Sequence, residues 1–109
     1  MSGLRTINSF TFEKFRNSSG PIIDIRSPKE YSQGHWVKAI NLPLFNNNER
    51  ERIGIAYKQK SRKDAISLGI EVIIPRLKEL KNSLEVLYRD AQIANNSSEE
   101  IYLRIYCWR

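Results

Sequence analysis

The stretch Ile22–Glu30, with the sequence IIDIRSPKE, decides the fold of this chain. It opens with a brief β-branched run that is bounded by turn residues and too short for a normal helix, which indicates a buried parallel strand. Asp24 then lies near the carboxyl end of that strand. Ser27 precedes a proline, and Glu30 follows three residues later, as in a capping box. The stretch therefore predicts a strand that leads directly into a short helix, which ends at Gly34.

Outward from this stretch, strands and helices continue to alternate. A short helix is expected over 9–17, capped by Ser9 or Thr11. Ala39–Pro43 predicts a second short strand, because proline cannot donate to a ladder. A charged helix is expected from Glu49 to about Lys60, with its cap in the asparagines at 46–48.

A longer helical region follows Ser61, and Pro75 should kink or divide it. Apolar residues recur there at helical spacing, so we expect them to be buried against the rest of the domain. They are Ile73, Leu77, Leu80, Leu84 and Leu87. Ile101–Tyr106 is the strongest strand signal in the chain. This order predicts a single α/β domain over residues 1–109, a parallel sheet covered by helices on both faces.

Composition restricts the class of protein. Apolar residues make up 40% and charged residues 28% of the chain, as in ordinary globular proteins. No apolar run could cross a bilayer, and the N-terminus lacks the pattern of a secretory signal, so we expect a cytoplasmic protein that does not contact a membrane. The net charge of +6 favours polyanionic partners. One cysteine and one histidine exclude an internal disulfide and a zinc site, and we expect no bound cofactor.

The cysteine, Cys107, directly follows the predicted strand Ile101–Tyr106. Ligands of parallel α/β sheets gather outside the carboxyl ends of the strands. A thiol there is activated when the next loop turns backbone N–H groups inward. The residues alone leave two alternatives open, a nucleophile and an inert buried cysteine.

Two stretches, Ile23–His35 and Ala39–Pro43, closely resemble the front signature of rhodanese-like domains. The resemblance implies a three-layer α/β fold in which one cysteine carries sulfur or selenium, in the loop after the fourth core strand. Cys107 occupies that place. The family usually has Gly-His-Ile-Pro-Gly-Ala where this chain has Gly34–Ala39, GHWVKA, so a turn proline and glycine are lost.

A narrower resemblance, to the rhodanese module of bacterial tRNA 2-selenouridine synthases, covers nearly the whole chain. It is carried by Asn41–Phe45, Glu49-Arg50, Ile53-Gly54, Tyr57–Gln59, Ala65, Leu68-Gly69 and Tyr106–Arg109. That family replaces sulfur by selenium, drawn from selenophosphate, in 2-thiouridine at the wobble position of tRNA, through a geranylated intermediate. The resemblance thus implies a transferase with tRNA as its partner and a second domain that carries a P-loop.

The family's cysteine loop, its helix and its last strand have no counterpart after Arg109, and the P-loop motif G-x-x-x-x-G-K-[ST] does not occur. We therefore expect a truncated product or N-terminal fragment that is catalytically incompetent alone, because the anion-binding nest needs N–H groups beyond Cys107. A sheet cut at this point would leave an unpaired edge open to self-association.

The candidate site residues are Cys107 as the catalytic thiol, Arg109 and Arg26 as anion-binding groups, and a basic group that could follow tRNA phosphates. The basic group comprises Lys58, Lys60, Arg62 and Lys63. Each candidate has a structural alternative: an ion pair among Asp24, Arg26 and Glu30, and a solvated helical face for the mixed charges. His35 could act as an acid or base.

Two further functions stay open. The general signature alone also fits a stand-alone rhodanese-type sulfurtransferase. The positive charge, joined to an incomplete active loop, also fits a non-catalytic tRNA-binding or interaction remnant.

Overall fold

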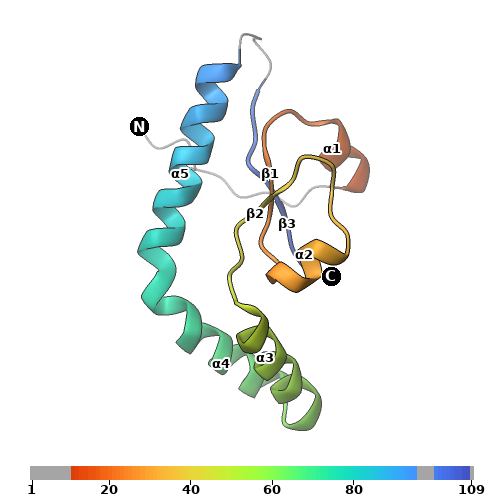
Figure 1. Ribbon diagram of the computed structural model, residues 1–109, viewed down its shortest axis with the longest axis vertical. Helices are drawn as coiled ribbons and strands as arrows, with labels where there is room; N and C mark the ends of the chain where they lie inside the picture. Colours follow the sequence, from red (N-terminus) through yellow and green to blue (C-terminus); the bar gives the residue numbers. More distant parts are fainter. Residues whose placement is uncertain (1–10, 96–99, 109) are drawn as a thin grey trace.

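A computed structural model of the chain describes residues 11–95 and 100–108 (Figure 1). The elements in chain order are α1 (Phe12–Asn17), β1 (Ile22–Asp24), α2 (Pro28–Gln33), β2 (Ile40–Asn41), α3 (Asn47–Gln59), α4 (Arg62–Ile73), the 3₁₀ turn η1 (Ile74–Arg76), α5 (Leu77–Ala94) and β3 (Arg104–Tyr106). The predicted α/β class, a parallel sheet flanked by helices, is confirmed.

The three strands form a parallel sheet in the order β2-β1-β3. Ile23 pairs with Ile40 on one side, and Asp24 pairs with Tyr106 on the other. The chain thus leaves β1 for one neighbour and later crosses to the opposite side of the sheet. This reversal creates a topological switch point at the carboxyl ends of β1 and β3, where open α/β sheets bind their ligands.

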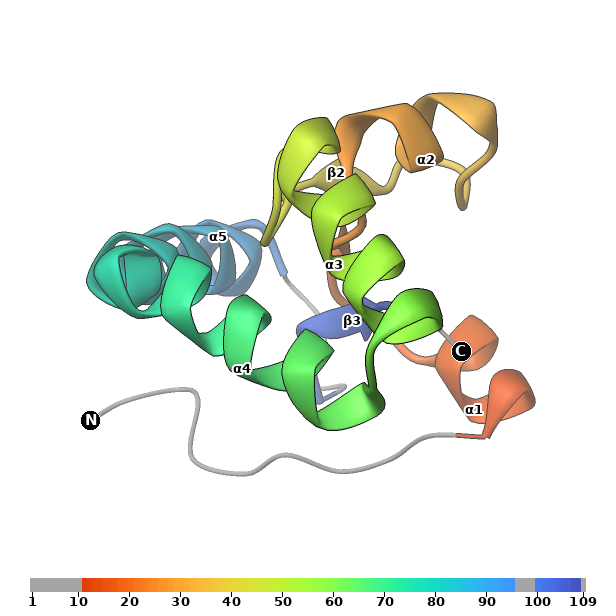
Figure 2. The ribbon, with the colours of Figure 1, turned by 90° about the horizontal axis from the view of Figure 1, so that it is seen from below.

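The helices surround the sheet on different sides. Figures 1 and 2 show α5 on one side of the strands and α1 and α2 on the other, while α3 and α4 lie beyond the carboxyl ends. All strands point towards the end of the molecule that carries α2 and α3. In the described part of the chain, α2 and α3 therefore lie close to the switch point.

Side-chain caps begin the helices where the sequence predicts them. Ser27 and Glu30 form the predicted capping box of α2, and Asn46 caps α3 in a second box with Glu49. Thr11 caps α1 through the N–H of Lys14, whereas the alternative cap, Ser9, lies outside the described residues. Local hydrogen bonds of this kind satisfy backbone donors that a helix leaves free.

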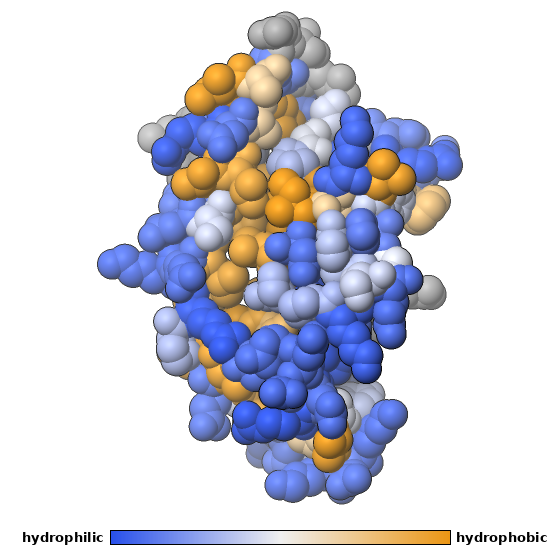
Figure 3. Space-filling model, in the orientation of Figure 1, coloured by the Kyte–Doolittle hydropathy of each residue, from blue (hydrophilic) through white to orange (hydrophobic). Residues whose placement is uncertain are grey.

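Pro75 divides the long helical region at η1, as predicted. The prediction that the apolar stripe is buried is wrong for part of it, since Leu77 is 53% exposed and no α5 residue is fully buried. The 18 residues of α5 span about 27 Å, whereas a strand of three residues spans only about 10 Å. Short strands cannot cover so long a helix, and Figure 3 shows apolar side chains in a band between α5 and the strands.

Two strands are shorter than the sequence predicts. Of the predicted strand Ala39–Pro43, only Ile40–Asn41 forms β2. The Ile101–Tyr106 segment contributes only its last three residues to β3, and Ile101 makes an isolated parallel bridge with Ser19. Ile23 and Asp24 of β1 are fully buried, so the best-packed point of the described chain adjoins the switch point. No helix in the described ranges is long and apolar enough to cross a membrane.

Candidate active site at the carboxyl edge of the sheet

The thiol of Cys107 lies at the switch point. Cys107 follows Tyr106, which pairs with Asp24 and accepts a hydrogen bond on its carbonyl oxygen from the N–H of Ile25, at 3.1 Å. The residue is exposed, so the prediction of a buried cysteine in the second alternative is wrong. The position at the carboxyl edge leaves the sulfur accessible to a ligand.

An ion pair fixes the chain on the amino side of Cys107. The carboxylate of Asp24 is fully buried and accepts hydrogen bonds from Nε of Arg26 at 3.0 Å and from its Nη2 at 2.8 Å. Hydrogen bonding to Asp24 raises the pKa of Arg26 against the opposing effect of burial. The Arg26 guanidinium also donates to the Gly34 carbonyl at 2.7 Å and lies 4.9 Å above the Tyr106 ring. Arg26 therefore holds Tyr106 against the Ile23–His35 stretch.

A second set of contacts fixes the chain on the carboxyl side of Cys107. Nε1 of Trp108 donates to both carboxylate oxygens of Glu30, at 2.8 and 2.9 Å. The indole ring also lies 6.1 Å from the Phe45 ring and 5.2 Å from the guanidinium of Arg50. Arg50 forms an ion pair with Glu30 at 3.4 Å that lacks hydrogen-bond geometry.

Glu30 is ionised more easily than a free glutamate. Partial burial raises its pKa, but hydrogen bonds from Trp108 and Ser27 and the charge of Arg50 outweigh burial and lower the pKa below its usual range. The negative charge strengthens its hydrogen bonds to the indole. Cys107 thus lies between two anchored residues: Tyr106 contacts Arg26, and Trp108 contacts Glu30.

His35 lies at the end of α2, next to this edge. Its ring stacks on Tyr31 at 3.7 Å, and its Nδ1 lies 2.7 Å from the Tyr31 carbonyl oxygen. A carbonyl only accepts, so Nδ1 carries a proton and Nε2 of the neutral ring is an acceptor. Among the residues described, no His, Cys, Asp and Glu side chains gather in a group that could hold a metal ion.

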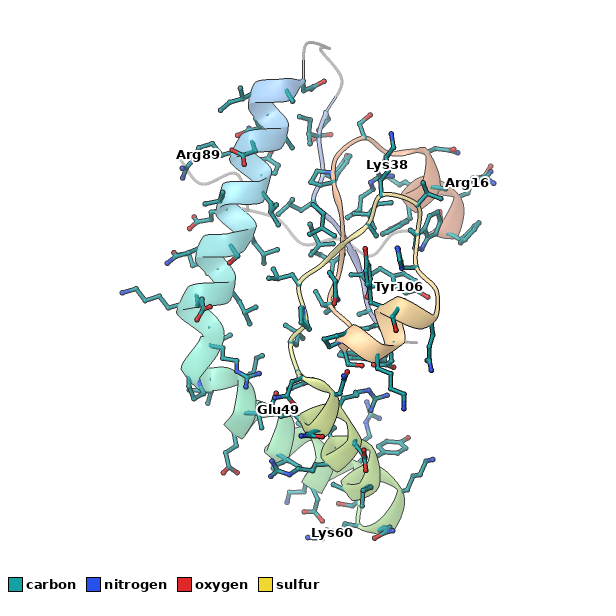
Figure 4. All side chains as sticks on the ribbon, viewed as in Figure 1. Arg16, Lys38, Glu49, Lys60, Arg89 and Tyr106 are labelled. Atoms are coloured by element: carbon teal, nitrogen blue, oxygen red, sulfur yellow. The ribbon has the colours of Figure 1, made fainter. Side chains whose placement is uncertain are left out.

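The predicted basic group lies apart from Cys107. Lys58 and Lys60 at the end of α3 and Arg62 and Lys63 at the start of α4 are all exposed. Figure 4 shows Lys60 at the end of the molecule beyond the carboxyl ends of the strands. Lys58 follows Arg50 in α3 by eight residues, which is about 12 Å along the helix, and this length separates the basic group from Arg50.

The structure brings Cys107 and Arg26 to the same edge through Tyr106, whereas Arg109 lies outside the described residues. Sequence reasoning missed Trp108, whose position directly after the only cysteine was the available signal. It also assigned Glu30 to an ion pair with Asp24 and Arg26, but the contacts of Glu30 are with Ser27, Trp108 and Arg50.

A parallel α/β domain with one exposed thiol at its switch point is the class that these features define. The model of the family described as "Rhodanese-like domain" matches residues 11–90. The chain belongs to the rhodanese-like domain family.

Relatives of the chain are named tRNA 2-selenouridine synthase. The protein of Shewanella denitrificans is 39% identical over 103 residues, which cover 94% of this chain and 26% of the relative. The protein of Serratia proteamaculans is 43% identical over 63 residues, 58% of this chain and 17% of the relative. The chain thus spans about a quarter or less of these relatives.

One solved structure is similar to this chain over most of the length of both chains. It is the crystal structure of the "N-terminal domain of putative ATP/GTP binding protein" from Clostridium difficile 630, with a TM-score of 0.72 and 29% identity. The match covers 92% of this chain and 71% of that one.

Proposed function

We propose that this chain is the selenium-carrying module of a tRNA 2-selenouridine synthase and acts in the cytoplasm. Cys107, as a mixed disulfide with a small thiol, is attacked by selenophosphate; the small thiol leaves, and hydrolysis releases phosphate to give a Cys107 perselenide. The perselenide attacks C2 of the geranylated 2-thiouridine at the wobble position of tRNA, and geranylthiol leaves. A small thiol then cleaves the S–Se bond, which frees the 2-selenouridine and re-forms the mixed disulfide. One observation carries the proposal: the sole thiol of the chain is exposed at the switch point of a rhodanese-like sheet. The names of the relatives supply the substrate class.

The charged candidates receive separate roles in this proposal. Arg109, two residues past the thiol, pairs with the anion of the perselenide or of phosphate, since guanidinium donors suit such anions. Arg26 assists as a positive charge, because its Nη1 takes part in none of its hydrogen bonds to Asp24 and Gly34. The basic turn formed by Lys58, Lys60, Arg62 and Lys63 contacts tRNA phosphates.

We further propose that the 109-residue chain does not complete the transfer alone. Within residues 11–95 and 100–108, no group donates a hydrogen bond to the Cys107 sulfur, although a reactive thiolate needs such donors or a nearby positive charge. The P-loop domain of the family is then its functional partner.

Mass spectrometry tests whether Cys107 carries selenium. The chain is first converted to its Cys107 mixed disulfide with oxidised glutathione, freed of excess reagent and then incubated with selenophosphate. It is expected to replace the glutathione by one selenium atom, and the matched Cys107→Ser variant is expected to gain none. In a full-length synthase that contains this module, Cys107→Ala should abolish tRNA selenation and spare tRNA binding. Selenation that persists in that variant would overturn the proposal.

The same samples separate the alternatives. Transfer of sulfur from thiosulfate to cyanide by the 109-residue chain would support a stand-alone sulfurtransferase. Selenation of thiolated tRNA by the chain without a partner would contradict the proposed need for a P-loop domain.

A salt series tests the basic turn. Each phosphate contact changes the slope of log affinity against log salt by about 0.9 on duplex nucleic acid and about 0.7 on single strands. Lys58→Ala and Lys60→Ala should therefore weaken tRNA binding and flatten the slope. Lys78→Ala, at an exposed position on α5, is the matched control and should leave the slope unchanged. Equal slopes for all variants would remove the basic turn from the tRNA interface.

A further inference from the structure

An open hollow of about 280 Å³ lies beside the end of β3. Its lining residues are Arg26, Gly34, His35, Trp36 and Tyr106. His35, Trp36 and Tyr106 carry flat rings, and Arg26 carries a planar guanidinium. Tyr106 directly precedes Cys107. The wall of the hollow thus consists largely of surfaces on which another flat group could stack.

Contacts behind the wall hold these rings in place. Trp36 packs against Phe12 at 5.6 Å and Phe15 at 5.1 Å, and Arg26 lies over Tyr106. The ring of His35 is supported on one face by Tyr31, which leaves its other face and Nε2 available. A ligand would therefore meet rings that are already ordered, and ordering them would cost little on binding.

The charge around the hollow is suited to a polyanion. Figure 4 shows Arg16 on α1 and Lys38, in the segment that follows α2, on the same side of the strands as Tyr106. The two acids closest to the lining residues in sequence are already engaged, Asp24 by Arg26 and Glu30 by Trp108. A ligand with a flat ring and a negatively charged backbone fits both the wall and its surroundings.

We propose that this hollow is a stacking site for one nucleobase of a single-stranded RNA. Single-stranded bases are bound on aromatic and guanidinium planes, while the phosphates follow neighbouring cations. The volume is just below the range of ligand pockets, which starts at about 300 Å³, and suits one base rather than a larger ligand. The acceptor Nε2 of His35 can receive an N–H from a base edge. The inference rests on the proposed function, for which it names a second contact with the RNA besides the basic turn.

NMR of the unmodified chain tests the site, because its two tryptophans give two indole N–H signals. A short oligouridylate should shift the Trp36 signal, assigned with the Trp36→Phe variant. An oligomer of abasic ribose phosphate of equal length should leave that signal in place. Equal shifts with both oligomers would mean that phosphates alone are bound, and no shift with either would mean that no base enters; either outcome overturns the inference.

Affinity measurements add a second, independent test. His35→Ala should weaken binding of the oligouridylate by about fivefold or more, the loss typical of one stacked base. Gln33→Ala, an exposed substitution two residues away on α2, is the matched control and should bind like the original chain. In the Cys107→Ser variant, the oligouridylate should still shift the Trp36 signal. Selenation that requires Cys107, combined with an unresponsive Trp36, would therefore refute this site and leave the proposed function intact.

Discussion

The indole of Trp108 donates to both carboxylate oxygens of Glu30, 78 residues earlier in the chain. The same carboxylate closes the capping box of α2 by accepting from Ser27. One acid therefore joins the helix that follows β1 to the residue that follows Cys107. The position of the thiol depends on this contact as well as on the pairing of β1 with β3.

Trp108→Phe should destabilise the fold by about 1 kcal/mol, because it removes the donor to a charged, partly buried carboxylate and keeps an aromatic ring. Denaturant unfolding of the two proteins measures the difference. Trp36→Phe is the matched control: it also replaces an indole by a phenyl ring but removes no hydrogen bond to an acid. An equal loss in both variants would show that ring size, and not the bond to Glu30, determines the effect.

Acid should weaken the fold through Glu30. Its pKa in the folded protein lies below the ordinary value of 4.5, so its stabilising contribution is complete above that value and is lost as the pH falls through the lower folded-state pKa. The free energy of unfolding should therefore fall as the pH drops below about 4.5. Glu30→Gln should flatten the profile in this window, and parallel profiles for the two proteins would contradict the assignment.

Glu49 should contribute to the same acid sensitivity. A side-chain hydrogen bond from Arg76, at 2.8 Å to Nη1, lowers the pKa of Glu49 in spite of burial. Its contribution is likewise present above the ordinary value and lost below it. Glu49→Gln should flatten the acid limb of urea unfolding measured at a series of pH values. The double variant Glu30→Gln and Glu49→Gln should flatten the acid limb more than Glu49→Gln alone.

Local signals in the sequence predicted most of the fold but only part of the site. Ser27 and Glu30 are three residues apart, so their capping box is encoded in a short segment. The contact between Glu30 and Trp108 depends instead on how β3 aligns with β1, which no local pattern contains. The exposure of Leu77 could not be predicted either, because helical spacing identifies an apolar face without giving the length of the sheet opposite.

Gly20→Ala should destabilise the fold by about 3 kcal/mol. Gly20 has a φ of 121°, and an added Cβ would lie within 1.8 Å of the Tyr102 carbonyl oxygen. The substitution would therefore push apart the segments that lead into β1 and β3. Gly54→Ala on α3 is the matched control, because its Cβ would meet only Arg50 at 3.5 Å and alanine favours helix. Thermal melting that places Gly20→Ala at or above the original protein would refute this reading.

Lys38→Gly should stabilise the fold by up to about 1 kcal/mol. Lys38 has a φ of 66°, in the left-handed region that glycine adopts without a Cβ penalty, at the position where rhodanese-like domains usually have glycine. The connection into β2 thus has, at Lys38, a backbone conformation that costs a residue with a Cβ more than it costs glycine. Lys29→Gly, in helix α2, should instead lower the melting temperature. A Lys38→Gly variant that melts below the original protein would show that the lysine side chain outweighs the backbone strain.

Self-association should occur through β3. In the described chain β3 pairs only with β1, and Arg104 donates to Pro21 while Tyr106 accepts from Ile25. Backbone groups of successive residues point to opposite sides of a strand, so the N–H and C=O of Ile105 face away from β1 and can pair with another chain. Its side chain is 42% exposed.

Sedimentation should show association that rises with concentration, and Ile105→Lys should suppress it by placing a charge on the edge. Val37→Lys, which replaces another β-branched apolar side chain that is 82% exposed and belongs to no strand, should leave the association unchanged. Suppression by both substitutions would assign the association to general surface hydrophobicity, and a monomer at every concentration would show that the edge stays unpaired.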